Sequence, residues 1–373
     1  MKKKITIIGR GIIGLATAFE LAQRGAEVEV MGSANTIGVA SYAAVGISSI
    51  KGLRVAKDDF FRAKMAGHEQ FTEFLRKVSK CSGLEIPIVK GVYEYFKDPN
   101  HYQNVRDRTY HGEFTGFLNC QIHNSDELSE YKLLSAHLKK SKLLGAFRFP
   151  GDLWFHPTAL LKALELAVLK LGGKIKDEQV VRIVPHQDRG FRIEARGREY
   201  VCSQLVLACG EATPSLIKNI SQIDFPFISI SGQTLVSTCS NDVKETFRIG
   251  RKALNMYGSQ LRYGSTDFPK NHIPTTEELE SVKSELINEL SEQFSLTVKH
   301  ENTEYLWGTR LALKDRRPII GKLPCVGNRA LWISCGYHKS GFNLAGLAGE
   351  VLAEKLLGEQ PDVDKFYSIS RFR

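Results

Sequence analysis

The feature that most constrains the fold is a glycine-rich turn near the N-terminus. Residues 5–8 (Ile-Thr-Ile-Ile) lead directly into Gly9-x-Gly11-x-x-Gly14. The first glycine permits a tight turn, the second lets the backbone approach a pyrophosphate, and the third lets a following helix pack against the strand. The apolar residues after the turn would form that helix, with its N-terminal N–H groups aimed at phosphates. Since a second strand is predicted over 27–31, the chain is expected to bind a dinucleotide, either FAD or NAD.

The acidic residue that usually follows such a turn is missing. Dinucleotide-binding units carry Asp or Glu roughly 20 residues after the glycines, where it binds the adenosine ribose. This chain has Gly32-Ser33 at that place. Strand alternation takes the Glu29 side chain away from the ribose, so we interpret Glu29 as a solvated strand residue. Ser33 or backbone groups are then expected to hold the ribose, and Gly32→Glu is expected to tighten cofactor binding.

Composition is typical of a soluble globular protein. The 373 residues are 42% hydrophobic and 25% charged, and no segment is long and apolar enough to span a bilayer. The seven cysteines form no Cys-x-x-Cys pair, which favours reduced thiols over a disulfide frame or a metal site. Glycines interrupt the first apolar run, so we expect no signal peptide and a cytoplasmic location. The net charge of +10 indicates either a polyanionic partner such as RNA or diffuse surface charge.

Several motifs, in this order, resemble the D-amino-acid oxidase and glycine oxidase family of FAD enzymes. They are the glycine turn, the small-residue loop 40–46 (Ala-Ser-Tyr-Ala-Ala-Val-Gly), the segment 308–321 and the turn 336–341. The two C-terminal motifs are the more specific, with Arg-Pro-Ile-Ile-Gly followed by Gly-Tyr-His-Lys-Ser-Gly. The resemblance covers nearly the whole chain and implies non-covalently bound FAD.

The order of predicted elements indicates an α/β fold with two lobes. We predict a Rossmann-like FAD-binding domain made of residues 1–84, 150–216 and 310–373. An inserted α+β substrate domain, built on an antiparallel or mixed sheet, is predicted for residues 85–149 and 217–309. Buried strands are predicted over 204–209 and 331–335, and each is followed by a glycine. Such apolar strands are typical of parallel sheets.

The family resemblance implies roles for individual residues. Arg310 would hold the substrate carboxylate, because a planar guanidinium can make a bidentate pair with it; the alternative is a salt-bridged arginine. His338 and Lys339 are candidate catalytic residues at a turn that stabilises negative charge on the flavin, although a packed histidine and a solvated lysine are the simpler interpretations. Tyr263 and Trp307 either line the substrate pocket or belong to the core. The predicted cofactor-binding residues are Gly9, Gly11, Ile12, Ile13, Gly14, Ser33, Ala40, Ser41, Ala43, Ala44, Gly46, Val181, Ala208, Gly210, Gly336, His338, Lys339, Ser340 and Gly341.

The resulting hypothesis is FAD-dependent oxidation of the C–N bond of a small-molecule amine, either an amino acid or an N-substituted glycine. Hydride transfer to flavin N5 would be followed by transfer of the electrons to oxygen or a quinone. The C-terminal part of the chain also resembles the flavin domain of bifunctional tRNA wobble-uridine enzymes, in the segments 345–350 (Ala-Gly-Leu-Ala-Gly-Glu), 357–361 (Leu-Gly-Glu-Gln-Pro) and 370–372 (Ser-Arg-Phe). That resemblance implies a carboxymethylaminomethyl-uridine substrate, and the positive charge agrees with a tRNA partner. A non-catalytic flavin- or RNA-binding protein is a third alternative.

Overall fold

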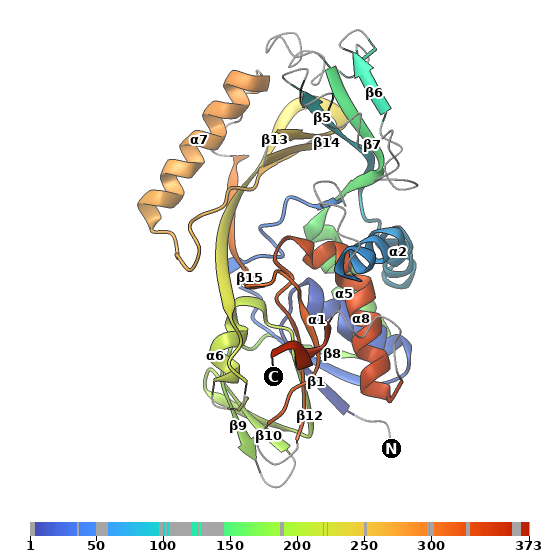
Figure 1. Cartoon of the computed structure of the whole chain (residues 1–373), viewed down its shortest axis with the longest axis vertical. Helices are drawn as coiled ribbons and strands as arrows, with labels where there is room; N and C mark the ends of the chain where they lie inside the picture. Colours follow the sequence, from blue (N-terminus) through green and yellow to red (C-terminus); the bar gives the residue numbers. More distant parts are fainter. Residues whose placement is uncertain are drawn as a thin grey trace.

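Two β-sheets organise the chain (Figure 1). The computed structural model describes residues 4–35, 37–49, 59–96, 100, 103, 121–124, 127–128, 131, 145–186, 190–218, 220–221, 223–249, 252–294, 296, 298, 302–325, 329–359 and 367–372. Most of the segment 97–144, which was assigned to the inserted domain, lies outside the described residues.

The first sheet has six strands in the order β16-β17-β12-β1-β2-β8. Its neighbours are parallel except at the β16 edge, which runs antiparallel to β17. The glycine turn and the turn 336–341 follow β1 and β17, which are separated only by β12, so both turns lie at the same end of the sheet. This arrangement confirms the predicted Rossmann-like fold. The strands are β1 (Lys4–Ile8), β2 (Glu27–Met31), β8 (Lys174–Lys176), β12 (Gln204–Leu207), β16 (Ile319–Lys322) and β17 (Ala330–Cys335).

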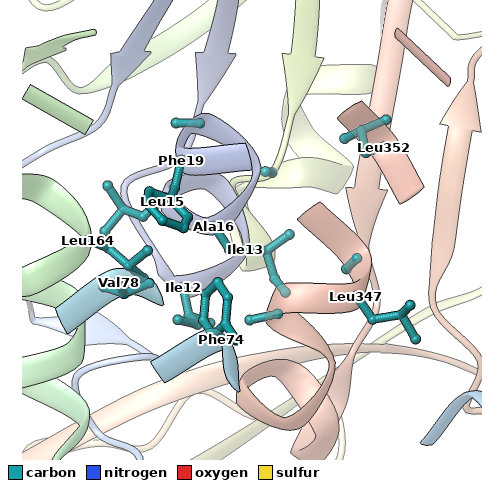
Figure 2. Packing of buried hydrophobic residues seen from close by; sticks show 14 of the residues in the cluster. Ile12, Ile13, Leu15, Ala16, Phe19, Phe74, Val78, Leu164, Leu347 and Leu352 are labelled. Carbon is teal, nitrogen blue, oxygen red and sulfur yellow. The ribbon is translucent and has the colours of Figure 1, made fainter. Parts of the chain in front are cut away.

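Three helices cover one face of this sheet, α1 (Ile12–Gln23), α5 (Pro157–Lys170) and α8 (Gly341–Leu357), and α2 (Asp59–Ser82) packs against α5 and α8 (Figure 1). Helix α1 is mostly apolar and is buried on nearly every side, because it packs against α5, α8 and the sheet; Phe19 is fully buried. Figure 2 shows Phe19 and Leu15 of α1 near Phe74 and Leu164 of the neighbouring helices. A tight core on this face therefore fixes the start of α1, where the glycine turn lies.

The opposite face is covered by a three-stranded antiparallel sheet of β9 (Val180–His186), β10 (Gly190–Ala195) and β11 (Arg198–Cys202), with the short helix α6 (Thr213–Ile217). Glu29 on β2 is 5% exposed and forms ion pairs with Lys176 (3.1 Å) and Lys4 (3.6 Å). The prediction of a solvated Glu29 is therefore wrong. Its carboxylate is buried because lysines on the two neighbouring parallel strands neutralise it.

The second sheet has eight strands and contains the antiparallel ladder of β13 with β14 and β15. Helix α7 (Thr276–Phe294) buries its apolar side against this sheet and lies along the outer side of β13 (Figure 1). The predicted domain boundaries at residues 150 and 310 fall inside strands β7 and β15. Strands β3 and β4 come from the N-terminal segment but belong to this second sheet, so the two lobes share strands. The strands are β3 (Gly38–Val39), β4 (Ile47–Ser48), β5 (Ile88–Phe96), β6 (Gln121–Asn124), β7 (Gly145–Phe155), β13 (Phe227–Ile249), β14 (Lys252–Gly264) and β15 (Glu304–Leu313). None of the helices in the described ranges is long and apolar enough to cross a membrane.

Candidate active site

Two adjoining cavities lie between the sheets. One, of about 450 Å³, surrounds the glycine turn and the end of β2. The other, of about 390 Å³, lies between the loop 40–47 and the second sheet. They form one elongated site because both are lined by the same six residues, which are Ile12, Ala40, Ser41, Arg310, His338 and Gly341.

The glycine turn is shaped for close backbone approach. Gly9 has φ +123°, and a Cβ atom there would lie 2.2 Å from the carbonyl oxygen of Ala208. A Cβ atom at Gly14 would lie 1.9 Å from the carbonyl oxygen of Gly9, which is why this position packs inside the turn and does not line a cavity. The N–H of Ile12 at the start of α1 donates to Ser41 Oγ (3.1 Å). The turn therefore lets a phosphate come close to the backbone at the start of α1, as dinucleotide binding requires.

Arg10 fills the place of the missing ribose acid. A Cβ atom at Gly32 would lie 2.6 Å from Arg10 Cβ and 2.7 Å from its backbone nitrogen. The Arg10 side chain is held by Glu165, with Nε donating to Oε1 at 2.5 Å. We therefore expect Gly32→Glu to weaken cofactor binding and not to tighten it, because the backbone at Arg10 leaves no room for a side chain. Ser33 does line this cavity.

The small-residue loop is held by a buried arginine. Arg262 on β14 is 4% exposed and donates to the carbonyl oxygens of Ala44 (2.6 Å) and Tyr42 (3.3 Å). Burial lowers the pKa of Arg262 to about 10, and the guanidinium remains charged at neutral pH. Thr234 Oγ1 adds a hydrogen bond to the carbonyl oxygen of Ala43 (2.7 Å). Three consecutive carbonyls are thus bound by the second sheet, and the small side chains of the loop line the cavities.

Arg310 binds a carboxylate of the protein itself. Its Nη2 donates to Asp267 Oδ1 (2.7 Å) and to the carbonyl oxygens of Thr266 (3.1 Å) and Ser231 (3.4 Å). Lys339 Nζ donates to the other carboxylate oxygen of Asp267 (2.6 Å). Burial alone would raise the pKa of Asp267, but the two cations outweigh burial and lower it. Arg310 and Lys339 therefore form a pair of donors that keeps a carboxylate ionised.

His338 lies at the junction of the two cavities. It begins the 3₁₀ turn His338–Ser340 before α8, and its φ of +51° is unusual for a residue with a side chain. Burial lowers its pKa to about 3, helped by the neighbouring cations Arg310, Arg316 and Lys339. The imidazole is therefore neutral at physiological pH. Its Nε2 is buried without a hydrogen-bond partner among the described residues, so it is available to a ligand.

Besides Gly14, three predicted site residues do not line either cavity. Tyr263 is fully buried in the core beneath α7, where its hydroxyl donates to Glu289 (2.7 Å), so the core interpretation applies. Trp307 packs beside Gly38 instead. Val181 is 57% exposed, whereas Val180 lines the cavity, because adjacent strand residues face opposite ways. The structure brings the remaining predicted residues to the site: Gly9, Gly11, Ile12, Ile13, Ser33, Ala40, Ser41, Ala43, Ala44, Gly46, Ala208, Gly210, Arg310, Gly336, His338, Lys339, Ser340 and Gly341.

Several lining residues had no signal in the sequence. Lys64 on α2, Arg248 near the end of β13 and Lys252 at the start of β14 line the cavity that Arg310 enters from β15. No motif marks them, because only the folding of the second sheet brings these distant segments together. Cys209 also lines the glycine-turn cavity, but burial raises the pKa of its thiol to about 11, which argues against a nucleophilic role.

Comparison with known proteins identifies the cofactor that fits this site. The family model for FAD dependent oxidoreductases matches residues 4–355. Glycine oxidase of Pseudomonas putida is 23% identical over 98% of this chain and 97% of its own length. The bifunctional protein ThiO/ThiG of a Nostoc species is 22% identical over 97% of this chain and 54% of its own length.

Solved structures show the same fold. Glycine oxidase from Geobacillus kaustophilus matches with a TM-score of 0.81 at 18% identity, covering 100% of this chain and 98% of its own. Iminodiacetate oxidase from Chelativorans sp. BNC1 matches with a TM-score of 0.80 at 18% identity, covering 99% of this chain and 98% of its own. The glycine turn, the start of α1 and the elongated double cavity fit FAD. The chain therefore belongs to the family of FAD dependent oxidoreductases and is an FAD-dependent enzyme.

Proposed function

We propose that this enzyme oxidises the C–N bond of an amino acid or an N-substituted glycine. The observation that carries the proposal is that Arg310 and Lys339, which both line the cavity, together hold the carboxylate of Asp267. All hydrogen bonds of the Arg310 guanidinium with described residues use Nη2. Nη1 and Nε each keep an N–H donor for a substrate carboxylate, through single hydrogen bonds, because both bidentate pairs of a guanidinium include Nη2. The relatives act on substrates of this kind, as their names state: glycine oxidase, iminodiacetate oxidase and L-amino acid deaminase.

The residues of this chain would bind and orient the substrate. FAD, when bound, supplies the acceptor for the hydride that leaves the α-carbon. Arg310 would fix the carboxylate and thereby the position of the α C–H bond, so that much of the rate comes from orientation. The substrate loses a hydride and a proton to become an imine, and water then hydrolyses the imine to a carbonyl compound and an amine. His338 is neutral, and it would therefore act through a hydrogen bond and not through charge. Oxygen or a quinone would then take up the electrons from the flavin. We also propose that the enzyme is located in the cytoplasm.

The test is anaerobic mixing of the purified, FAD-loaded protein with glycine, sarcosine and D-amino acids. We expect FAD to be released by heat or acid, and at least one of these amines to bleach the flavin absorbance. Arg310→Ala and Arg310→Lys should keep the flavin spectrum and raise KM strongly, because a lost charged contact in a pocket costs on the order of 2–5 kcal/mol. Arg76→Gln, which removes an exposed charge on α2, is the matched control. Wild-type kinetics in both Arg310 variants would exclude the carboxylate role.

A tRNA substrate is the second candidate, favoured by the net charge of +10 and the tail resemblance. If tRNA carrying carboxymethylaminomethyl-uridine is the substrate, it should reduce the flavin faster than any free amino acid does. Its affinity should also fall steeply with salt, because each neutralised phosphate releases counterions. Rapid reduction by a small amine, together with salt-independent or absent tRNA binding, would rule this candidate out.

A further inference from the structure

The cavity that receives the substrate is lined by cations on more than one side. Five basic side chains and no acidic one occur among the described residues that line it. Arg310 and Lys339 form one group beside the glycine-rich turns. Lys64, Arg248 and Lys252 form a second group, contributed by α2 and by the far part of the β13–β14 hairpin. A substrate with a single carboxylate, bound at Arg310, would leave this second group of cations without a role in substrate binding.

Lys252 and Arg248 have acidic partners that do not line the cavity, and these partners bind the two cations at different distances. Lys252 Nζ is bound by Glu285 (2.6 Å) and Glu289 (2.7 Å) of α7. Arg248 has one ion pair with a described residue, Asp152 of β7, at 3.9 Å. That separation exceeds hydrogen-bond distance, so the carboxylate attracts the guanidinium without occupying its donors. Of Lys252 and Arg248, Arg248 is therefore the better able to bind a further anion.

Asp152 is itself held in place by a buried polar network. It is 1% exposed, accepts a hydrogen bond from Ser49 Oγ, and lies 3.9 Å from His68 Nε2. His68 Nδ1 is in turn 2.9 Å from Ser48 Oγ, which donates to Asn343 Oδ1 of α8 (2.6 Å). The network connects β4, β7, α2 and α8, so Asp152 forms a fixed base behind Arg248. Burial lowers the pKa of Arg248, which means that its charge is incompletely compensated and would gain from an anion in the cavity.

We propose that the substrate carries two anionic groups, an α-carboxylate bound at Arg310 and a second carboxylate bound at Arg248. Arg310 pairs with Ile230 near the beginning of β13, whereas Arg248 lies near the end of that strand, so the two guanidiniums reach one cavity from different places. The substrate class is an N-carboxyalkyl glycine or an acidic amino acid. This inference rests on the proposed oxidation of a C–N bond and specifies its substrate.

The first experiment compares two ligands that differ only at the second anion, iminodiacetate and its monoamide. Binding to the FAD-loaded wild-type protein is measured from the perturbation of the flavin spectrum, and turnover from its bleaching. We expect iminodiacetate to bind at least about tenfold more tightly, because its second carboxylate gains a charge-assisted hydrogen bond. D-Glutamate and D-glutamine provide a second matched pair. Equal affinities within both pairs would overturn the inference.

The second experiment assigns the preference to Arg248. Arg248→Gln should reduce the dianion preference to about threefold or less, whereas Arg248→Lys, which keeps the charge beside Asp152, should retain part of it. Arg76→Gln should leave the preference at the wild-type value. If a folded Arg248→Gln protein keeps the wild-type preference for the dianion, Arg248 is not the second carboxylate site. If that variant does not fold, the comparison of the two ligands on the wild-type protein tests the inference by itself. If iminodiacetate binds preferentially but no amine bleaches the flavin, the anion subsite stands and the proposed oxidation fails.

Discussion

Gly232→Ala is the substitution whose effect the structure predicts most sharply, because two physical effects of opposite sign compete there. Gly232 is a buried residue of β13 that pairs with Gly308 of β15. In an unobstructed strand, replacing glycine by alanine would stabilise the protein by about 0.5–1 kcal/mol, since glycine loses more backbone freedom on folding. At this position the new Cβ atom would lie 2.2 Å from Arg310 Nη2 and 2.4 Å from the carbonyl oxygen of Thr266.

The clash should win over the backbone effect. The guanidinium can move, but the Thr266 carbonyl is backbone, and the Thr266 N–H is hydrogen-bonded to Gln233 (3.2 Å). Overpacking of this kind costs about 1–3 kcal/mol. Displacing Nη2 also weakens its bond to Asp267, and a hydrogen bond to a charged group contributes about 1.5–3 kcal/mol. We therefore expect a net loss of about 1–3 kcal/mol of folding free energy and weaker binding of carboxylate ligands at Arg310.

The assay is thermal unfolding of Gly232→Ala beside wild type, combined with titration of sarcosine monitored by the flavin spectrum. The variant should melt at a lower temperature and bind sarcosine at least about tenfold more weakly, a loss of 1.4 kcal/mol or more. Thr238→Ala, at an exposed position on the same strand, is the control and should match wild type in both measurements. A Gly232→Ala protein that is as stable as wild type and keeps its sarcosine affinity would refute the steric argument.

Three further outcomes follow from the site. Gly32→Glu should weaken FAD binding, measured by flavin fluorescence on titration, because its Cβ collides with the backbone at Arg10; tighter binding would contradict this. Arg262→Met should lower the melting temperature, since the removal of two charged hydrogen bonds costs about 3–6 kcal/mol, whereas an unchanged value would show that the loop is held otherwise. The pKa of His338 falls from 6.5 to about 3 on folding, so stability should drop as pH falls below 6.5, by about 2 kcal/mol at pH 5. Urea unfolding of His338→Gln should lack this loss, and an equal loss in the variant would assign it to other groups.

Much of the cofactor half of the fold could be predicted from local sequence alone. The glycine turn after β1 specifies a strand, a tight turn and a helix within about a dozen residues, and the turn 336–341 repeats the pattern before α8. Such patterns act over short distances, so their consequences do not depend on the rest of the fold. The loop 40–46 can be predicted in the same way, because a run of residues with small side chains can be read directly from the sequence. These segments do lie together around one elongated site.

Roles that depend on which way a side chain points could not be predicted as well. Tyr263 and Val181 both lie on strands, and a shift of one residue along a strand separates a cavity wall from the core or from solvent. The Glu29 error has a related cause, since the lysines that neutralise it come from neighbouring strands that the sequence does not pair.

The sequence by itself therefore determined the dinucleotide fold, the backbone cradle and the candidate carboxylate-binding Arg310, because each depends on a short contiguous motif. The tertiary structure alone decided which charges meet in the cavity. Arg248 and Asp152 are far apart in the chain and belong to no motif, but strands β13 and β7, which are separated in the second sheet only by β5, bring them together at the cavity wall. Electrostatic pairing depends on distance in space, and only the folded second sheet sets that distance.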